Sequence, residues 1–154
     1  AIHLLLTSVF GPGFNLENGY VIPSIIKKIS DAEKEGKNFI EGWGSGKSLR
    51  DFLYIEDAVR GIILATEQYD KPGPVNIASG GTVLIRGLVN LIAKLMDFQG
   101  EIRWDATKSD GQLNRTIDVS KAKDEFGFTV TTPLEAGLKE TINWYLCQQN
   151  SIKQ

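Results

Sequence analysis

A glycine-rich stretch at residues 42–46 carries side chains that could hold a flat, anionic ligand. Trp43 lies within the stretch, and Arg50 follows shortly after it. An indole ring offers a face for stacking and for cation–π contacts. A guanidinium group forms paired hydrogen bonds with phosphate oxygens. These residue types fit a ligand with a base and a phosphate, while a surface hairpin that binds nothing would show the same pattern.

Gly46-Lys47-Ser48 also resembles the end of a phosphate-binding P-loop. That pattern needs a glycine at the position that Glu41 occupies here, and a helix must begin directly after the loop. Bulky residues over 49–54 predict a strand instead. The stretch therefore departs from a P-loop twice. We predict two strands, before and after the glycines, that pair as a hairpin.

Few other groups suggest chemistry. Two further cations, Lys28 and Arg115, lie where they could join an anion site. His3, the only histidine, lies in an apolar run and is expected to be a strand residue. Cys147 is the only cysteine, so the chain has no disulfide framework and no cysteine-rich metal site. We therefore predict no metal and no nucleophile–base set.

The composition narrows the class of protein. The chain has 154 residues, of which 42% are hydrophobic and 23% charged, which suits one domain with a core. The net charge is −2, without a long run of one sign, so we predict no nucleic-acid partner. No apolar run has the length of a membrane span, and we expect a cytoplasmic protein without a membrane partner.

Apolar periodicity predicts alternating strands and helices, which is the α/β class. The continuous run Ile2–Leu6 is typical of a strand that is buried on both faces of a parallel sheet. Because such a strand at a terminus lacks partners, we expect the chain to be a piece of a longer protein and disfavour a free-standing small domain. Predicted helices begin at Val21, Glu56, Leu84, Ser120 and Pro133; further strands are expected over 75–78, 100–104 and 115–117.

Several motifs in order resemble the C-terminal half of an extended short-chain dehydrogenase/reductase. They are Thr7–Gly13, Asn18–Pro23, Trp43–Gly46 with Arg50–Asp57, Asn76–Gly80 and Lys108–Gly111. Within that superfamily the chain is most similar to the GDP-L-fucose synthases and related NAD-dependent epimerase/dehydratases, from residue 2 to about residue 146.

The resemblance implies the substrate-binding part of a Rossmann-type protein. Residues 1–13 would be the end of the parallel sheet, 14–148 the substrate-binding domain and 149–154 a frayed tail. The family's glycine-rich cofactor loop and Tyr-x-x-x-Lys pair would precede this chain, in which no tyrosine has a lysine four residues on. The piece alone would be inactive, and the parent would be a homodimer.

The resemblance also assigns site residues. Leu6, Thr7, Ser8 and Val9 would line the nicotinamide end of NAD or NADP. A nucleotide-diphosphate sugar would be held by Lys28, Trp43, Arg50, Asp110 and Arg115. Tyr20 takes the place of a family histidine that is thought to donate a proton. A tyrosine, with an unperturbed pKa of about 10, is a poor proton shuttle at neutral pH.

Together these observations predict the nucleotide-sugar-binding part of an NAD(P)-dependent nucleotide-sugar epimerase or reductase. The alternative is a non-catalytic nucleotide-sugar-binding or scaffold protein on the same fold. Ser8 and Tyr20, which depart from the family's residues, keep that alternative open.

Overall fold

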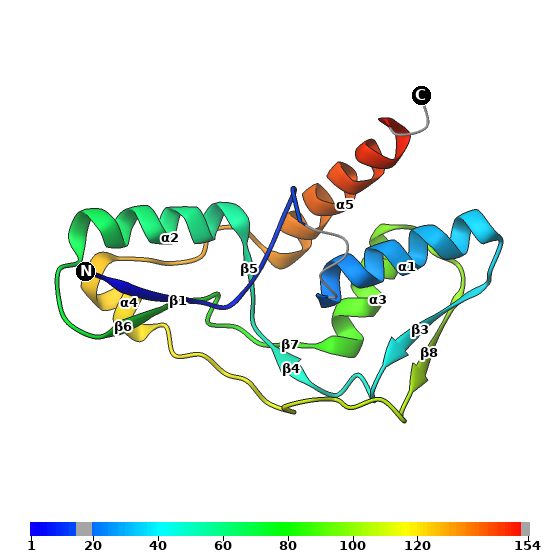
Figure 1. The fold of residues 1–154 in the computed structure, drawn as a ribbon, viewed down its shortest axis with the longest axis horizontal. Coiled ribbons are helices and arrows are strands. Elements are labelled where there is room, and N and C mark those ends of the chain that lie inside the picture. The colour runs from blue at the N-terminus through cyan, green and yellow to red at the C-terminus, as the bar shows by residue number, and fades with distance from the viewer. Residues whose placement is uncertain (15–19, 152–154) are drawn as a thin grey trace.

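The computed structural model describes residues 1–14 and 20–151, which alternate between strands and helices and confirm the predicted α/β class (Figure 1). The elements are β1 (His3–Leu6), β2 (Ser8–Phe10), α1 (Val21–Glu35), β3 (Phe39–Trp43), β4 (Leu49–Arg50), β5 (Phe52–Tyr54), α2 (Ile55–Gln68), β6 (Pro74–Ile77), β7 (Val83–Leu84), α3 (Ile85–Leu95), β8 (Glu101–Asp105), α4 (Ser120–Phe126) and α5 (Leu134–Ser151).

The strands pair across long sequence separations. β1 pairs with β6, β2 with β5 and β3 with β8, all in parallel, whereas β4 and β7 are antiparallel. The predicted hairpin is therefore wrong, although both of its strands exist. The Gly44 N–H donates to the carbonyl oxygen of Asp105 at 3.0 Å, which extends the β3–β8 pair, and the chain then turns toward β7. Gly44 and Gly46 adopt φ angles of 74° and 70°, which glycine tolerates because it has no Cβ.

Two hydrophobic clusters flank β5, the strand near the middle of the molecule in Figure 1. One lies among α1, α3, α5, β3 and β8, and the other among α2, α4 and β6. Side chains alternate along a strand, so Phe52 and Tyr54 enter the first cluster while Leu53 enters the second. β5 thus joins the two halves of the molecule.

Helix α1 forms as its sequence predicts. Ile22, Ile25, Ile26 and Ile29 share one face and are buried. Gly36 ends the helix in the left-handed conformation, with φ 66°. The helix is therefore fixed in the first cluster, and its N-terminus lies beside β2 and β5.

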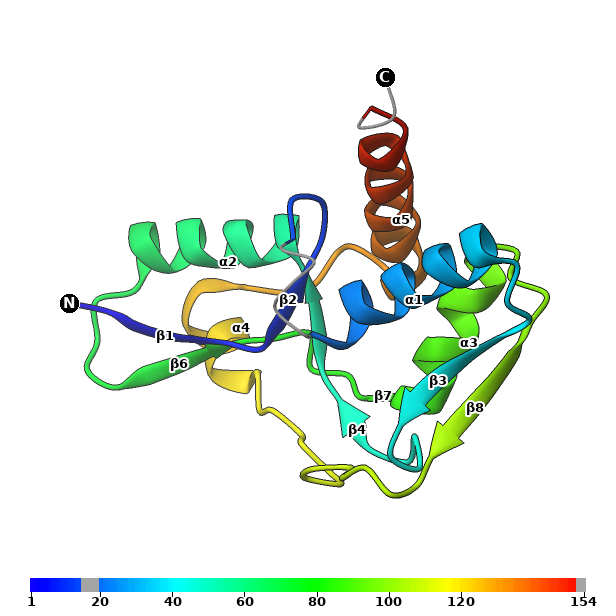
Figure 2. The ribbon, with the colours of Figure 1, turned by 45° about the vertical axis from the view of Figure 1, so that its right-hand side comes forward.

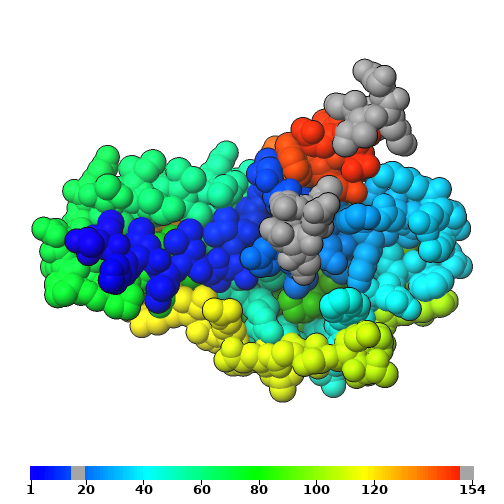
Figure 3. All heavy atoms as spheres, in the orientation of Figure 1, coloured from blue at the N-terminus to red at the C-terminus, as the bar shows by residue number. Residues whose placement is uncertain are grey.

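Strand β1 is parallel, as predicted, but it is not buried on both faces in this chain. Leu5 and Leu6 are 55% and 43% exposed. β6 covers one edge of β1, and Figure 3 shows the residues of β1 and β2 at the surface of this face. Residues 1–10 thus pair with β5 and β6, and the predicted division at residue 13 remains a prediction.

The ends of other elements differ from the prediction. Residues 115–117 form no strand, and only Asn114 makes an isolated bridge, to Leu49. Ser120 does not cap α4, because the N-cap is Val119 and the Ser120 N–H donates to the Asp118 carboxylate at 2.9 Å. Helix α5 continues through Ser151, so residues 149–151 are helical where we expected a frayed tail. Residues 152–154 and the loop expected over 15–19 lie outside the described residues. Within the described ranges, no helix combines the length and hydropathy that a bilayer crossing needs.

Candidate functional site

A small pocket lies where β2, β5 and the first turn of α1 meet. It has a volume of about 90 Å³, and its lining includes four residues that the sequence predicted separately: Ser8, Val9, Tyr20 and Arg50. The parallel register places Ser8 opposite Phe52. The pairing of β2 with β5 therefore brings the predicted cofactor-binding segment next to a predicted phosphate-binding arginine.

Tyr20 lies at the N-terminus of α1 as its N-cap residue, and 67% of its surface is exposed. It forms no side-chain cap, so no capping bond occupies its hydroxyl. The predicted catalytic position thus lies at the rim of the pocket, where a phenol can meet a ligand.

Within the predicted cofactor-binding segment, exposure differs from residue to residue. Leu6, Ser8 and Val9 are exposed, and Val9 is 37% exposed. Thr7 is half-buried, and its hydroxyl donates to the Asp51 carbonyl oxygen at 3.1 Å. The Thr7 hydroxyl therefore serves the fold, and three of the four predicted residues present side chains to the surface.

A second pocket, of about 160 Å³, lies between α1 and α3 and is lined by Lys28, Trp43 and Trp104 among others. The Trp43 side chain is 68% exposed, and the Lys28 ammonium lies 5.3 Å from its ring centroid. The same ammonium donates to the Glu41 carbonyl oxygen at 2.7 Å. Both pockets include Val21, so they lie on either side of the first turn of α1.

The environment of Lys28 is partly dehydrated. Burial lowers the pKa of Lys28 below its ordinary value, and the negative charge of Glu41 opposes that shift. The ammonium is held between an indole face and a carbonyl, which leaves a positive charge at the edge of the second pocket. Such a charge can attract a phosphate without forming the paired contacts of arginine.

Trp104 and Arg86 belong to this region, and the sequence prediction missed both. A Cβ on Gly42 or on Gly46 would lie 2.8 Å or 2.7 Å from the Trp104 ring, so glycine is required there for space. Arg86 stacks over Trp104 at 5.1 Å and donates to the Ser45 carbonyl oxygen at 2.8 Å. Glycine at alternate positions from 42 to 46 indicated that another group packs closely against this stretch. The sequence does not reveal that this group is Trp104.

Arg50 is half-buried beside the first pocket. It donates to the carbonyl oxygens of Leu49 and Asp110, at 2.8 Å and 3.3 Å. A guanidinium has five N–H donors, so these two bonds orient the group and leave donors for a ligand. Arg50 is therefore positioned by main-chain atoms, as an anion-binding residue needs.

Two other predicted ligand residues are placed differently. The Asp110 carboxylate accepts the Ser45 N–H at 2.6 Å and the Ser45 hydroxyl at 2.8 Å. These hydrogen bonds hold the pKa of Asp110 below its ordinary value. Arg115 is exposed and lines neither pocket. Asp110 therefore contacts Arg50 through its own main-chain carbonyl oxygen. Arg115 lies outside the two pockets.

The exposed segment at residues 6–9 fits a nicotinamide cofactor. Leu6 ends β1 beside Ile77, the last residue of β6, so two parallel strands end together there. Ligands of open α/β sheets bind at the carboxyl ends of parallel strands. Leu6 and Val9 offer apolar surface for an aromatic ring, and Ser8 offers a hydroxyl. Among the described residues, no group of three or more His, Cys, Asp or Glu side chains could hold a metal ion.

The chain is similar to known proteins in both sequence and structure. The chain is 34% identical to the probable GDP-L-fucose synthase 1 of Oryza sativa over 156 residues, which cover all of this chain and 47% of that protein. The crystal structure of a GDP-L-fucose synthetase from Naegleria fowleri bound to NADP matches with a TM-score of 0.89 and 30% identity, over 97% of this chain and 48% of that chain.

A UDP-N-acetylglucosamine 4-epimerase from Methanobrevibacter ruminantium, in complex with UDP-N-acetylmuramic acid, matches with a TM-score of 0.83 and 26% identity, over 96% of this chain and 46% of that chain. This chain thus spans about half the length of the relatives that it matches. The family model for NAD-dependent epimerases/dehydratases matches residues 1–78. The chain belongs to the NAD-dependent epimerase/dehydratase family.

Proposed function

We propose that this chain is the nucleotide-sugar-binding part of an NAD(P)-dependent nucleotide-sugar epimerase or reductase of the GDP-L-fucose synthase type. One observation carries the proposal. Ser8 and Val9 of β2, Tyr20 and Arg50 come from three segments and line a single pocket. The pocket with Lys28 and Trp43 adjoins it across Val21. A ligand that spans both would meet an aromatic face, two cations and the predicted cofactor segment.

Each group has a role in this proposal. Trp43 stacks against the nucleotide base, since its ring is exposed. Arg50 and Lys28 hold the diphosphate through charge-assisted hydrogen bonds. The sugar then lies toward Ser8 and Tyr20, where hydroxyl groups can bond its oxygens.

Leu6, Ser8 and Val9 would contact the nicotinamide end of NAD or NADP. Bound NAD(P) would exchange a hydride with the sugar. This chain contributes apolar surface that keeps water from that end of the site, and hydroxyls that orient the sugar. It contains no tyrosine with a lysine four residues on, so we expect no turnover by these residues alone.

The experiment that tests the proposal is calorimetric titration of the chain with GDP, UDP and dTDP at low salt. We expect one nucleotide to bind, and Arg50→Ala to weaken it by about tenfold or more, because a charge-assisted hydrogen bond is lost. Binding of none by the folded chain contradicts the proposal.

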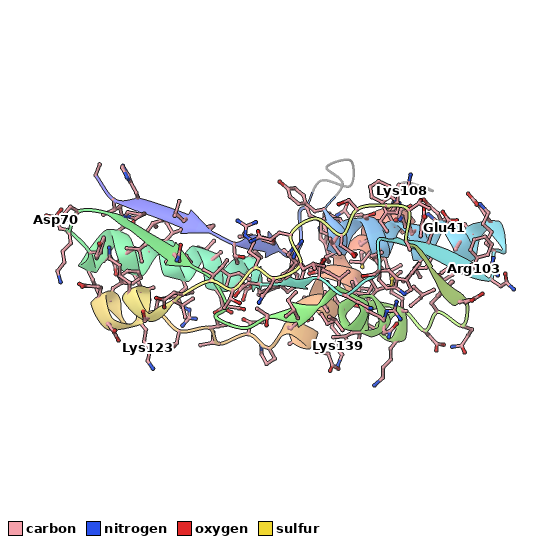
Figure 4. All side chains as sticks on the ribbon, turned by 90° about the horizontal axis from the view of Figure 1, so that it is seen from below. Glu41, Asp70, Arg103, Lys108, Lys123 and Lys139 are labelled. Atoms are coloured by element: carbon pink, nitrogen blue, oxygen red, sulfur yellow. The ribbon has the colours of Figure 1, made fainter. Side chains whose placement is uncertain are left out.

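Lys123→Ala is the matched control, because it also removes one positive charge. Lys123 lies on α4, at the opposite end of the molecule from Glu41 and Lys108 (Figure 4). We expect it to bind like the wild type. An equal loss in Lys123→Ala and Arg50→Ala would show that only net charge matters, and would contradict a site at Arg50.

A further inference from the structure

The segment between β8 and α4 runs along one edge of the molecule, beside the glycine stretch and β4 (Figure 2). The Leu49 N–H donates to the Leu113 carbonyl oxygen at 2.8 Å, and Asn114 bridges to Leu49. Asp110 lies in this segment and contacts both Ser45, in the glycine stretch, and Arg50.

The Asp110 carboxylate fixes the glycine stretch. It accepts both the N–H and the hydroxyl of Ser45, at 2.6 Å and 2.8 Å. A side chain at Gly44 would collide with the Asp110 carboxylate, so the two segments touch there. Ser45 lies two residues after Trp43, so these hydrogen bonds hold the turn that directly follows the tryptophan.

The Asp110 main chain fixes Arg50. Its carbonyl oxygen accepts hydrogen bonds from Arg50 at 3.3 Å and from the Ser48 hydroxyl at 2.8 Å. A Cβ on Gly111 would be 3.6 Å from the Arg50 guanidinium, so that group lies against the next residue as well. One residue therefore contacts both the turn that carries the aromatic ring and the guanidinium.

We propose that Asp110 is a positioning residue for nucleotide-sugar binding, whose carboxylate latches the turn at Ser45 and whose main chain orients Arg50. The inference rests on the proposed function. It differs from the sequence prediction, in which Asp110 belonged to the ligand contacts. Both carboxylate oxygens already accept hydrogen bonds from Ser45, so the carboxylate acts through the turn that follows Trp43, while the main-chain carbonyl acts through Arg50.

Asp110→Ala and Asp110→Asn test this role. With whichever of GDP, UDP and dTDP binds most tightly, we expect Asp110→Ala to lower the affinity by about tenfold. Asp110→Asn should stay within about threefold of the wild type. The asparagine oxygen can accept the Ser45 N–H, and its amide can donate to the Ser45 hydroxyl. Asp118→Ala is the control, because that exposed carboxylate also accepts a backbone N–H, from Ser120.

The Trp43→Ala background separates positioning from contact. Asp110→Ala should cause no further loss of affinity there, because the ring on the turn that the carboxylate holds is gone, and the main-chain carbonyl that bonds Arg50 is still present. A full further loss, or an Asp110→Asn variant as weak as Asp110→Ala, would show direct contact with the ligand and overturn the proposal.

Amide hydrogen exchange gives a readout without ligand. Exchange at the Ser45 N–H should be about tenfold or more faster in Asp110→Ala at unchanged global stability, because its acceptor is lost. If Asp110→Ala does not fold, Ser45→Ala, which removes only the hydroxyl, should show a smaller affinity loss in the same direction. If the wild type binds a nucleotide and both Asp110→Ala and Ser45→Ala bind it as tightly as the wild type does, Asp110 is not a positioning residue, while the proposed function stands. If the wild type binds none of the nucleotides, both fail.

Discussion

Charged side chains have opposite surroundings in two regions of this molecule. Asp51 and Asp57 are 2% and 1% exposed, and hydrogen-bond donors surround both carboxylates. Lys28 and Arg50 lie half-buried at the two pockets and donate to main-chain oxygens, and Lys28 also lies over the Trp43 ring. The first pair is satisfied within the fold, whereas the second pair keeps N–H donors that no described residue accepts.

The carboxylates connect segments that are distant in sequence. Asp51 accepts the N–H groups of Ser79 and Gly80, at 3.0 Å and 2.9 Å, and so ties the end of β6 to β5. Asp57 accepts the N–H groups of Thr131 and Thr132, at 3.1 Å and 3.0 Å, and fixes the approach to α5. The half-buried cations Lys28 and Arg50 therefore belong to the candidate site, whereas the buried carboxylates Asp51 and Asp57 hold the fold together. We call these two carboxylates the framework carboxylates.

Removing a framework carboxylate should have the largest effect. We expect Asp51→Ala to lower the free energy of unfolding by about 3 kcal/mol, because the N–H groups of Ser79 and Gly80 and the Ser79 hydroxyl lose a buried acceptor. Urea unfolding followed by circular dichroism measures it. If Asp51→Ala lowers the free energy of unfolding by less than about 0.5 kcal/mol, which is typical of a surface substitution, then Asp51 does not stabilise the fold more than the cations at the pockets do.

Replacing Arg50 should show the reverse pattern. Arg50→Ala should weaken nucleotide binding by about tenfold or more, while the free energy of unfolding changes by less than about 1 kcal/mol. Titration and urea unfolding on the same sample give both numbers. If Arg50→Ala unfolds as readily as Asp51→Ala, then Arg50 is part of the framework.

Lowering the pH should reduce the free energy of unfolding, in part because Asp57 becomes protonated. Burial raises the pKa of Asp57, but hydrogen bonds from Thr131 and Thr132 outweigh that effect and leave the pKa below its ordinary value. A carboxylate whose pKa is lower in the folded state stabilises the fold above the unfolded pKa, near 4, and this contribution is lost as the pH falls through the folded value. Unfolding curves from pH 7 to pH 3 should show the loss, and Asp57→Asn should show a shallower one. The same slope in both proteins would assign the effect to other groups.

Lys28 should give the smallest effect. We expect Lys28→Ala to weaken nucleotide binding by about threefold, since a half-exposed ammonium contributes less than a guanidinium with paired contacts. Its lowered pKa adds a second expectation, a loss of its contribution at a pH below that of an ordinary lysine. Titrations across the alkaline range check this. If Lys28→Ala binds more weakly than Arg50→Ala, the order of the two cations is wrong.

Most helices and strands could be predicted from the sequence, but which strands pair with one another could not. Helices α1 and α3 follow from apolar residues at helical spacing, and Gly36 marked the end of α1 correctly. The hairpin failed because alternation shows which residues of a strand face the core, but not which strand lies beside it. The partner of β3 is β8, and nothing local to residues 39–43 encodes that choice.

The candidate site shows the same limit. Residue type alone made Trp43 and Arg50 candidates for ligand binding, and that assignment remains a prediction. The latch at Asp110 depends on a contact with Ser45 across the fold, and the burial of Asp51 depends on donors at Ser79 and Gly80. Such partners arise from tertiary structure, so a carboxylate that serves the fold looks the same in sequence as one that binds a ligand.

The nucleotide site is tested most directly by mapping the amide chemical-shift changes in the wild-type chain as GDP, UDP or dTDP is added. We expect changes at Ser8–Phe10, at the first turns of α1 and from Trp43 to Arg50, with little change in α4. Changes confined to α4 and the N-terminal half of α2, or none at saturating nucleotide, would contradict the assignment of the half-buried cations to a ligand site.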